Sequence, residues 1–477
     1  MLCAIINGPS FIEAKQQILN SLPFVESIEL RIDHLSSLSE EEIHKLVVLA
    51  KKPILTLKQI ESIPHETWVK QVINLAKFHP EYLDIDYSFP KDALSHIQRC
   101  YPDIKILLSF HSDTHVHLPT IYKNMLKIPA HEYKLAVSPT SSLETFHYIR
   151  YKNQLPENTT LICMGDIGVP SRILSPLMKN KRNYISAPHV PPIAPGQLSL
   201  DKLLDYNYTH LSEKSHIYGL IGNPVNRSIS HISHNKLFSD LKLSASYIKI
   251  LLAPEELEPF ITLSQELPFK GLSITMPFKT KILKYIDVLD SSATQCQACN
   301  TLVFKNKTLI GYNTDGLGAI RLFSNKGISI KGSRIGIIGA GGTAKAIASA
   351  CAHLGADIYI FNRSIAPGAH LADLCGGSFF PLNELSNKHL IDILILCLPP
   401  EVSFPEIFPP TILDVNTLPK ESSYIKKAKQ KGCRILYGYE LFAQQALLQF
   451  SLWFPKTISQ QHCDQFLVYI ENIMNSM

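Results

Sequence analysis

No apolar run in this chain of 477 residues reaches the roughly 18 residues that a membrane-spanning helix needs. A long basic run is lacking as well, and a net charge of +5 is too mild to indicate a nucleic-acid partner. We therefore expect neither a membrane nor a nucleic acid as a partner, whereas the mild positive charge suits anionic small substrates. The hydrophobic and charged fractions, 45% and 18%, are those of a globular protein, and the length is enough for two or three domains.

The ten cysteines form no paired framework for zinc or for disulfide bonds. Several lie in apolar runs, as in Leu396–Leu398, which is typical of reduced, buried cysteines in cytosolic proteins. Cys296 and Cys299 form one C-x-x-C motif with no second pair and no nearby histidine, so we expect no metal site. The first strand-like run, Leu2–Ile6, begins at once and leaves no room for a signal or transit peptide. We therefore expect a cytoplasmic location.

Short apolar runs alternate with helical stretches over the first 200 or so residues, as a (β/α)₈ TIM barrel requires. A doubly wound sheet with extra strands is the alternative. The eight expected strands are Leu2–Ile6, Ser27–Ile32, Ile54–Leu57, Tyr82–Tyr87, Lys105–Phe110, Tyr133–Val137, Thr160–Met164 and Asn183–Ser186.

Polar residues follow the ends of these strands, where the active site of a barrel lies. Lys134 stands within an apolar run, and because a buried ammonium is costly we expect its pKa to be lowered. Such an amine can form a Schiff base with a ketone, although a lysine that reaches from the barrel end to solvent is the alternative. His111 is a suitable proton shuttle near neutral pH, and Arg31 and Arg172 could hold a carboxylate.

The motifs of this half resemble those of the type I 3-dehydroquinate dehydratases. They are D-I-D at Asp84–Asp86, I-L-L-S-F-H ending at His111, E-L-R-I-D beginning at Glu29, K-L-A at Lys134 and A-P-G-Q ending at Gln197. The resemblance implies that Lys134 forms an imine with the C3 ketone and that His111 is the general acid and base in the loss of water. It also implies substrate binding by the following residues: Glu29, Arg31, Lys58, Arg172 and Gln197.

The chain departs from this family at several positions. Lys58 stands where the family usually has arginine, so a bidentate contact is lost there. His111 is followed by Ser112 instead of Asp or Asn, and Ile193 replaces a serine before A-P-G-Q. The loop after Lys58 is compressed, and Glu61 is the candidate for the glutamate that, by the resemblance, orients the histidine.

A new pattern begins near residue 215, with a strand expected at His216–Ile221 and a G-N-P turn after it. Ser228 and Ser230 follow this turn and could either cap a helix or offer hydroxyl groups to a carboxylate. Further on, Gly271–Thr275 alternates like a strand and ends in T-M-P-F-K, whose last residue is Lys279.

Lys279 and Asp315 could together relay the proton that is exchanged when an alcohol is oxidised beside a hydride carrier. Asp315 lies in N-T-D-G, and Asn300 lies in the earlier loop motif N-T-L. Taken alone, Lys279 would more often be a solvated surface lysine.

The segment from Arg334 to Arg363 has the order of a dinucleotide-binding unit: apolar strand, glycine turn, helix and second strand. An ordinary strand-to-helix turn is the alternative for the glycines alone. The second strand ends in Asn362 and Arg363 rather than in an acidic residue, and a guanidinium can pair with a 2′-phosphate. We therefore expect NADP rather than NAD as the cofactor. The turn itself consists of Gly339, Ala340, Gly341 and Gly342.

The motifs of the second half, G-N-P with two serines, T-x-P-F-K, N-T-L, N-T-D-G and G-A-G-G, resemble the shikimate dehydrogenase family in their order. The resemblance implies that Lys279 and Asp315 are the catalytic pair and that Gly438 lies near the nicotinamide. Thr417 departs from the family, which normally has tyrosine there, and C-L-P at Cys397 replaces a polar turn. The implied substrate contacts are Ser228, Ser230, Thr275, Asn300 and Gln445, and the implied NADP contacts are Gly339, Ala340, Gly341, Gly342, Asn362 and Arg363.

Together the two resemblances imply a bifunctional enzyme that dehydrates 3-dehydroquinate to 3-dehydroshikimate and then reduces this product to shikimate with NADPH. The expected domains are a dehydratase barrel at 1–211, a substrate-binding subdomain at 215–325 completed by helices at 440–477, and an NADP-binding Rossmann subdomain at 330–437. A dehydrogenase that prefers quinate and an inactive ligand-sensing regulator on the same folds are the alternatives. The sequence leaves open whether the protein is a monomer or a homodimer.

Overall fold

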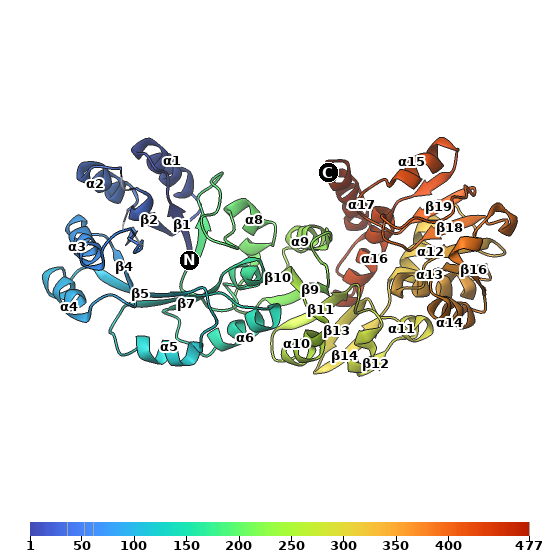
Figure 1. The fold of residues 1–477 in the computed structure, drawn as a ribbon, viewed down its shortest axis with the longest axis horizontal. Coiled ribbons are helices and arrows are strands. Elements are labelled where there is room, and N and C mark those ends of the chain that lie inside the picture. The colour runs from blue at the N-terminus through green and yellow to red at the C-terminus, as the bar shows by residue number, and fades with distance from the viewer. Residues whose placement is uncertain (36, 52, 61, 477) are drawn as a thin grey trace. The chain divides into compact units, whose positions relative to one another are not determined.

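The computed structural model describes residues 1–35, 37–51, 53–60 and 62–476. The chain forms two compact units, Met1–Ser215 and His216–Met477, and each is described by itself (Figure 1). Among the described residues, no helix combines the length and the apolar character that crossing a membrane requires.

The first unit is an eight-stranded parallel barrel, as predicted. Its strands follow one another in chain order, and β1 also pairs with β8, an arrangement that excludes a doubly wound sheet. The remaining edges, β7 and β8, are linked near their start, where the Asn180 side chain bonds the backbone N–H and C=O of Leu161 at 2.9 Å. The strands are β1 Leu2–Ile6, β2 Ser27–Arg31, β3 Ile54–Thr56, β4 Tyr82–Asp86, β5 Lys105–Ser112, β6 Glu132–Val137, β7 Thr159–Cys163 and β8 Asn183–Ser186.

Helices between the strands turn one apolar face to the barrel. In α1, Ala14 and Ile18 are buried one turn apart, and Ser10 with Glu13 forms a capping box at its start. The helices of this unit are α1 Phe11–Ser21, α2 Glu40–Leu49, α3 His65–Leu75, α4 Lys91–Cys100, α5 Leu118–Met125, α6 Ser142–Lys152, α7 Val169–Ile173 and α8 Leu200–Leu204.

The barrel interior is layered, because strand side chains repeat every two residues and alternate strands supply each layer. The lowest layer joins the even-numbered strands: the Arg182 guanidinium binds Glu132 at 2.7 and 2.8 Å and Ser27 at 2.8 Å, and it lies 4.5 Å from the Tyr82 ring centroid. We call these four residues the ion-pair layer. Two positions further along the same strands stand Glu29, Asp84, Lys134 and Tyr184.

The second unit contains two sheets. The first is mixed, with the order β10-β9-β11-β13-β14-β12. Its central strands β9 and β11 are parallel, so their carboxyl ends meet at one edge. Its elements are β9 His216–Gly222, α9 Ser230–Asp240, β10 Ala245–Leu251, α10 Leu257–Ser264, β11 Phe269–Ile274, β12 Val288–Leu289, α11 Ser291–Cys296, β13 Thr301–Lys305 and β14 Thr308–Tyr312.

The other sheet is parallel, with the order β17-β16-β15-β18-β19-β20 that is typical of a Rossmann fold. The glycine turn lies between β15 and α13, at the carboxyl edge of the sheet where such folds bind ligands. Its elements are α12 Asp315–Asn325, β15 Arg334–Ile338, α13 Gly342–His353, β16 Asp357–Asn362, α14 Ile365–Cys375, β17 Ser378–Pro381, β18 Ile393–Leu396, β19 Thr411–Asp414, α15 Ser423–Gln430 and β20 Arg434–Leu436.

The last two helices, α16 Gly438–Trp453 and α17 Gln460–Ser476, return to the first of these sheets. Their apolar residues share one core with β9, α9 and β10. Trp453 lies so close to Gly271 of β11 that a Cβ atom there would be 2.2 Å from the indole nitrogen. The close approach of α16 to α12 at Gly318 brings Gln445 beside the loop before β13 and the loop after β14.

Two candidate active sites

Lys134 is the centre of the polar cluster inside the barrel. Its ammonium lies 3.1 Å from a carboxylate oxygen of Asp84, 3.5 Å from one of Glu29 and 4.3 Å from the ring centroid of Tyr184. Thr56 of β3 donates a hydrogen bond to Glu29 at 2.6 Å. Lys134 is 6% exposed, so solvent weakens its attraction to the two carboxylates very little.

The expectation of a lowered pKa for Lys134 is wrong. Burial would lower the pKa, but the carboxylates of Asp84 and Glu29 outweigh it and hold the pKa above its ordinary value. Lys134 is therefore an ammonium at neutral pH and must pass a proton to a neighbour before it can attack a ketone. Burial raises the pKa of Asp84, but the charges of Lys134 and Lys58 outweigh it and hold the pKa below its ordinary value, so Asp84 stays ionised and Glu29 is the acceptor in reach.

His111 and Lys58 form a second polar pair near the carboxyl ends of the strands. Lys58 Nζ lies 2.9 Å from His111 Nδ1 and 3.1 Å from Nε2. Burial, Lys58 and Lys134 hold the pKa of His111 well below its ordinary value, and burial lowers the pKa of Lys58. His111 lies two positions beyond Ser109, which pairs in register with Lys134, so both side chains point into the barrel. A neutral imidazole on the same inner face of the barrel as Lys134 can accept a proton.

The guanidinium and amide groups predicted to bind substrate differ in their partners. Arg31 is already paired with Asp33 at 2.6 and 3.0 Å. Arg172 is buried, donates to the Tyr184 carbonyl at 3.4 Å, and has no partner for Nε among the described residues. Burial lowers the pKa of Arg172 to about 10, as expected for a guanidinium that faces no carboxylate. Gln197 has an equally unpartnered Nε2 in the described part of the chain. These two groups can receive an anion.

The positions that depart from the family pattern have local structural roles. Ile193 packs against the apolar interior of the barrel, and its N–H donates to Gln197 Oε1 at 3.0 Å. Ser112 turns back to the Thr114 carbonyl at 3.0 Å, away from His111. Glu61 lies outside the described residues.

In the second unit, the predicted substrate and catalytic residues line one cavity of about 760 Å³. This volume lies within the ordinary range for small-molecule sites. The cavity runs between the two sheets of this unit and reaches the glycine turn and α16. Its lining includes Ser228, Ser230, Thr275, Lys279, Asn300, Asp315, Ala340, Gly341, Gly342, Gly438 and Gln445.

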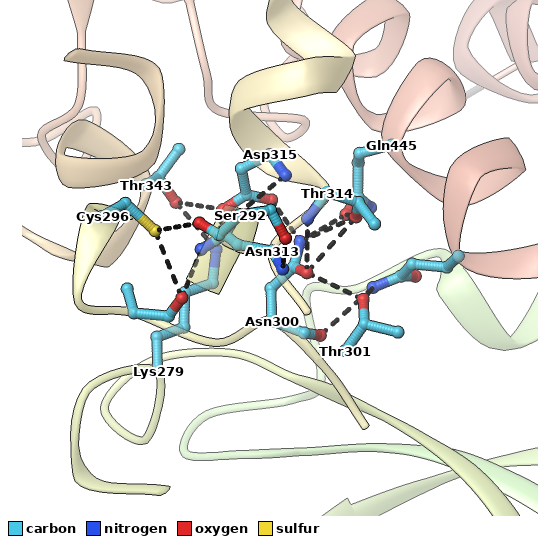
Figure 2. A network of polar contacts seen from close by, with 12 residues as sticks. Lys279, Ser292, Cys296, Asn300, Thr301, Asn313, Thr314, Asp315, Thr343 and Gln445 are labelled. Atoms are coloured by element: carbon cyan, nitrogen blue, oxygen red, sulfur yellow. Dashed lines mark hydrogen bonds and ion pairs between the residues drawn. The ribbon is translucent and has the colours of Figure 1, made fainter. Parts of the chain in front are cut away.

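Asp315 is held from both sides by a hydrogen-bonded network (Figure 2). Lys279 and Thr343 contact its Oδ2, while Asn300 donates to Oδ1 at 2.7 Å. The Asn300 amide also donates to Gln445 Oε1 at 3.1 Å. The network thus joins a lysine, a carboxylate and two amides from four separate segments of the chain. A lysine so paired can transfer a proton at the cavity wall.

The two serines lie at the start of α9, where Ser228 and Ser230 form a hydroxyl pair at 2.8 Å. The Ser230 N–H also donates to Ser228 Oγ at 3.2 Å. Ile229 is the N-cap of α9, and among the described residues no side chain caps this helix, so the helix-cap interpretation of the serines is wrong. Both serines line the cavity.

The glycine turn fits a dinucleotide. Gly339 has φ +108°, which favours glycine, and a Cβ there would lie 2.7 Å from the Cys397 carbonyl oxygen. At Gly341 no described heavy atom lies within 4 Å of a Cβ position, so this side of the turn is open. Among the described residues no side chain caps α13, and its first N–H groups are free for a pyrophosphate.

Asn362 and Arg363 lie at the end of β16, beside β15, but outside the cavity lining. Arg363 is exposed, and Asn362 donates to the Ser364 carbonyl at 2.8 Å. Gly438 stands where a Cβ would lie 2.1 Å from the Asn416 carbonyl oxygen, so only glycine permits this approach of α16.

Two residues of these sites were missed from sequence. Tyr184 lies within β8 with no motif around it, and only the alternation of side chains along this strand signals that it faces the barrel interior. Thr343 directly follows G-A-G-G, and a hydroxyl in the first helical turn was the available signal. Its partners lie 28 and 64 positions away, so no local pattern reveals them.

Three protein-family models match consecutive parts of the chain. The type I 3-dehydroquinase model matches residues 2–213, the shikimate dehydrogenase substrate binding domain matches 220–302, and shikimate/quinate 5-dehydrogenase matches 321–400.

Several relatives are similar along most or half of the chain. Shikimate biosynthesis protein AroDE of Chlamydia pneumoniae is 50% identical over 474 residues, which is 99% of each chain. The chloroplastic bifunctional 3-dehydroquinate dehydratase/shikimate dehydrogenase of Arabidopsis thaliana is 26% identical over 472 residues, 89% of this chain and 77% of that one. A shikimate dehydrogenase (NADP(+)) of Dehalococcoides mccartyi is 32% identical over 259 residues, 50% of this chain and 90% of that one.

Three observations indicate the same family. They are the buried lysine of the barrel, the Lys–Asp pair of the cavity and the similarity along the full chain. The chain therefore belongs to the family of bifunctional 3-dehydroquinate dehydratase/shikimate dehydrogenases.

Proposed function

We propose that Lys134 and His111 carry the dehydration of 3-dehydroquinate and that Lys279 and Asp315 carry the reduction of 3-dehydroshikimate to shikimate. The observation that carries the first assignment is the buried contact of Lys134 with two carboxylates beside a neutral His111.

In the dehydratase, Glu29 takes a proton from Lys134 while Asp84 remains an anion, and the free amine attacks the C3 ketone. Loss of water from this adduct gives an imine between Lys134 and the substrate. Because His111 is neutral, it removes the proton from C2, next to the imine, and returns it to the departing hydroxyl group at C1. Water then hydrolyses the imine, which releases 3-dehydroshikimate and restores the amine.

Substrate binding in the barrel is assigned to Glu29, Arg31, Lys58, Arg172 and Gln197. Arg172 is the strongest candidate for the carboxylate, because its buried guanidinium has no carboxylate partner among the described residues. Burial makes such a group costly until an anion binds, so substrate binding relieves the cost.

In the dehydrogenase, Lys279 donates its proton to the carbonyl oxygen of 3-dehydroshikimate, and Asp315 balances the charge of the lysine. When bound, NADPH supplies the hydride that reduces the carbonyl carbon. Ser228 and Ser230 offer hydroxyls to the substrate carboxylate. The ring hydroxyls are assigned to Thr275, Asn300 and Gln445, which share the cavity wall with the catalytic pair.

The cofactor is NADP, held by the glycine turn. Gly339, Ala340, Gly341 and Gly342 let the backbone approach the pyrophosphate at the N-terminus of α13. Asn362 and Arg363 would contact the adenosine end, where the guanidinium pairs with the 2′-phosphate. Gly438 would lie beside the nicotinamide.

The remaining assignments concern organisation. We assign the barrel to 1–211, the substrate-binding subdomain to 215–325 with 440–477, and the NADP-binding subdomain to 330–437. All ten cysteines are free thiols, which supports a reducing, cytoplasmic location. We propose that the protein is a monomer or a homodimer and that it has no nucleic-acid partner.

Borohydride trapping tests the dehydratase assignment. Reduction in the presence of 3-dehydroquinate should leave a covalent adduct on Lys134, identified by mass spectrometry of the digested protein. Lys58 is the internal comparison, because burial lowers its pKa and makes it the competing amine. An adduct on Lys58, or none, would remove Lys134 from the mechanism.

A further inference from the structure

Thr343 connects the proposed catalytic pair of the dehydrogenase to the dinucleotide-binding turn. Its hydroxyl lies 2.8 Å from Lys279 Nζ and 3.2 Å from Asp315 Oδ2 (Figure 2). The residue stands one position inside α13, directly after G-A-G-G. A side chain of the nucleotide-binding subdomain therefore completes a triangle with Lys279 of the substrate-binding subdomain and with Asp315.

The direction of the hydrogen bonds in this triangle is fixed by chemistry. An ammonium can only donate, so the Thr343 hydroxyl accepts from Lys279 and directs its own hydrogen to Asp315. Lys279 has three donors, of which Asp315 and Thr343 take two. The third has no partner among the described residues, and Lys279 lines the cavity. Two fixed donors thus aim the remaining one.

Asp315 and Lys279 differ in how firmly they are held. Asp315 begins α12 and is held by Asn300, by Lys279 and by Thr343, while Asn313 accepts from its backbone N–H at 3.0 Å. The long side chain of Lys279 has only Asp315 and Thr343 as hydrogen-bond partners in the described part of the chain. Without Thr343, the ammonium could rotate about its contact with Asp315.

We propose that Thr343 is a positioning residue that aims the Lys279 ammonium at the substrate oxygen. The inference rests on the proposed function of Lys279 and Asp315. Thr343 acts through Lys279, and because it belongs to the cofactor-binding turn, it aligns the proton donor with the subdomain that binds NADP. Its branched Cβ restricts the hydroxyl to few rotamers, which suits such a role.

The test compares Thr343→Val, which removes the hydroxyl at nearly constant volume, with Thr343→Ser, which keeps it. We expect Thr343→Val to lower kcat for shikimate oxidation about tenfold or more, because small misplacements of a reacting group reduce rates strongly. The KM for shikimate should stay within about twofold, since binding groups are untouched, and Thr343→Ser should recover most of kcat. The matched control is Ser349→Ala on the same helix, because that buried hydroxyl has no partner among the described residues.

A measurement without the cofactor gives an independent readout. Reductive methylation of the NADP-free protein, followed by mass spectrometry, reports how accessible the Lys279 amine is. Thr343→Val should raise the rate at Lys279 severalfold, because one of its two partners is gone. Ser349→Ala and Thr343→Ser should leave this rate unchanged.

The outcomes separate this inference from the proposed function. A normal kcat in Lys279→Met would overturn the catalytic pair itself. A large loss in Lys279→Met together with wild-type turnover and methylation in Thr343→Val would overturn only the positioning role. So would a Thr343→Val variant whose defect lies in KM alone, or a Thr343→Ser variant that does not recover.

Discussion

The ion-pair layer at the base of the barrel allows a quantitative prediction about stability. In Glu132→Gln the carboxylate is lost while the shape of the side chain is kept, so the Arg182 guanidinium remains buried without a counter-ion. Both side chains are 3% exposed, and the two contacts of 2.7 and 2.8 Å are those of a bidentate pair. Removing one partner of such a pair costs about 3–5 kcal/mol.

The chain contains a matched control on the same aromatic ring. Lys105 lies 5.3 Å from the Tyr82 ring centroid and pairs with Glu81 at 3.0 Å, but these side chains are 44% and 31% exposed. Solvent screens this pair, so Glu81→Gln should cost no more than about 1 kcal/mol. The two variants make the same chemical change and differ in burial.

The assay must report the barrel alone, because a chain with two units does not unfold in one step. Urea denaturation followed by dehydratase activity and by hydrogen exchange of the β6 and β8 amides meets this need. The Glu132→Gln midpoint should fall well below that of Glu81→Gln. A Glu132→Leu/Arg182→Met double variant should recover much of the loss, since no unpaired charge remains.

Equal shifts in Glu132→Gln and Glu81→Gln would refute the reasoning, because burial would then not decide the cost. A double variant as unstable as Glu132→Gln would show that packing rather than the unpaired charge is responsible.

Three further predictions concern the two sites. Asp84→Asn removes a carboxylate that raises the pKa of Lys134, so the pH profile of borohydride trapping should move to lower pH. Asp86→Asn makes the same change two positions along the strand and should leave the profile in place. Equal shifts in the two variants would contradict the pairing of Asp84 with Lys134. Arg363→Ala should raise the KM for NADPH about tenfold or more but leave that for NADH nearly unchanged, as steady-state kinetics with both cofactors will report. Gly271→Ala forces a methyl group into the indole of α16 and should destabilise the second unit by about 1–3 kcal/mol, measured as faster thermal loss of dehydrogenase than of dehydratase activity.

The fold was predictable because its strands are short apolar runs with clear ends. All eight barrel strands were expected within two residues of their bounds. Because the active site of a barrel lies at the carboxyl ends of its strands, the polar residues there could be predicted to form one site. The glycine turn and T-M-P-F-K were equally readable, since each needs particular residues at fixed spacing. Lys279 and Asp315 meet as the motifs implied.

Two aspects could not be predicted from local pattern. The charge of Lys134 depends on whether burial or the carboxylates of other strands dominate, and that balance is set only when β2, β4 and β6 assemble. The contact of Thr343 with Lys279 depends on how the two sheets of the second unit face each other. Both are tertiary properties, which the periodicity and spacing of residues in the sequence do not determine.

The return of α16 to the first sheet of the second unit has a consequence for synthesis. Gly271 and Trp453 touch, yet about 180 residues separate them in the chain. At about 5–20 residues per second, the ribosome needs roughly 10–40 s to make that stretch, and meanwhile β9 and β11 have no cover from α16. The barrel is complete before this interval begins. The dehydratase can therefore mature on the ribosome while its fusion partner still waits for its last helices, and the nascent dehydrogenase is the part that should depend on chaperones.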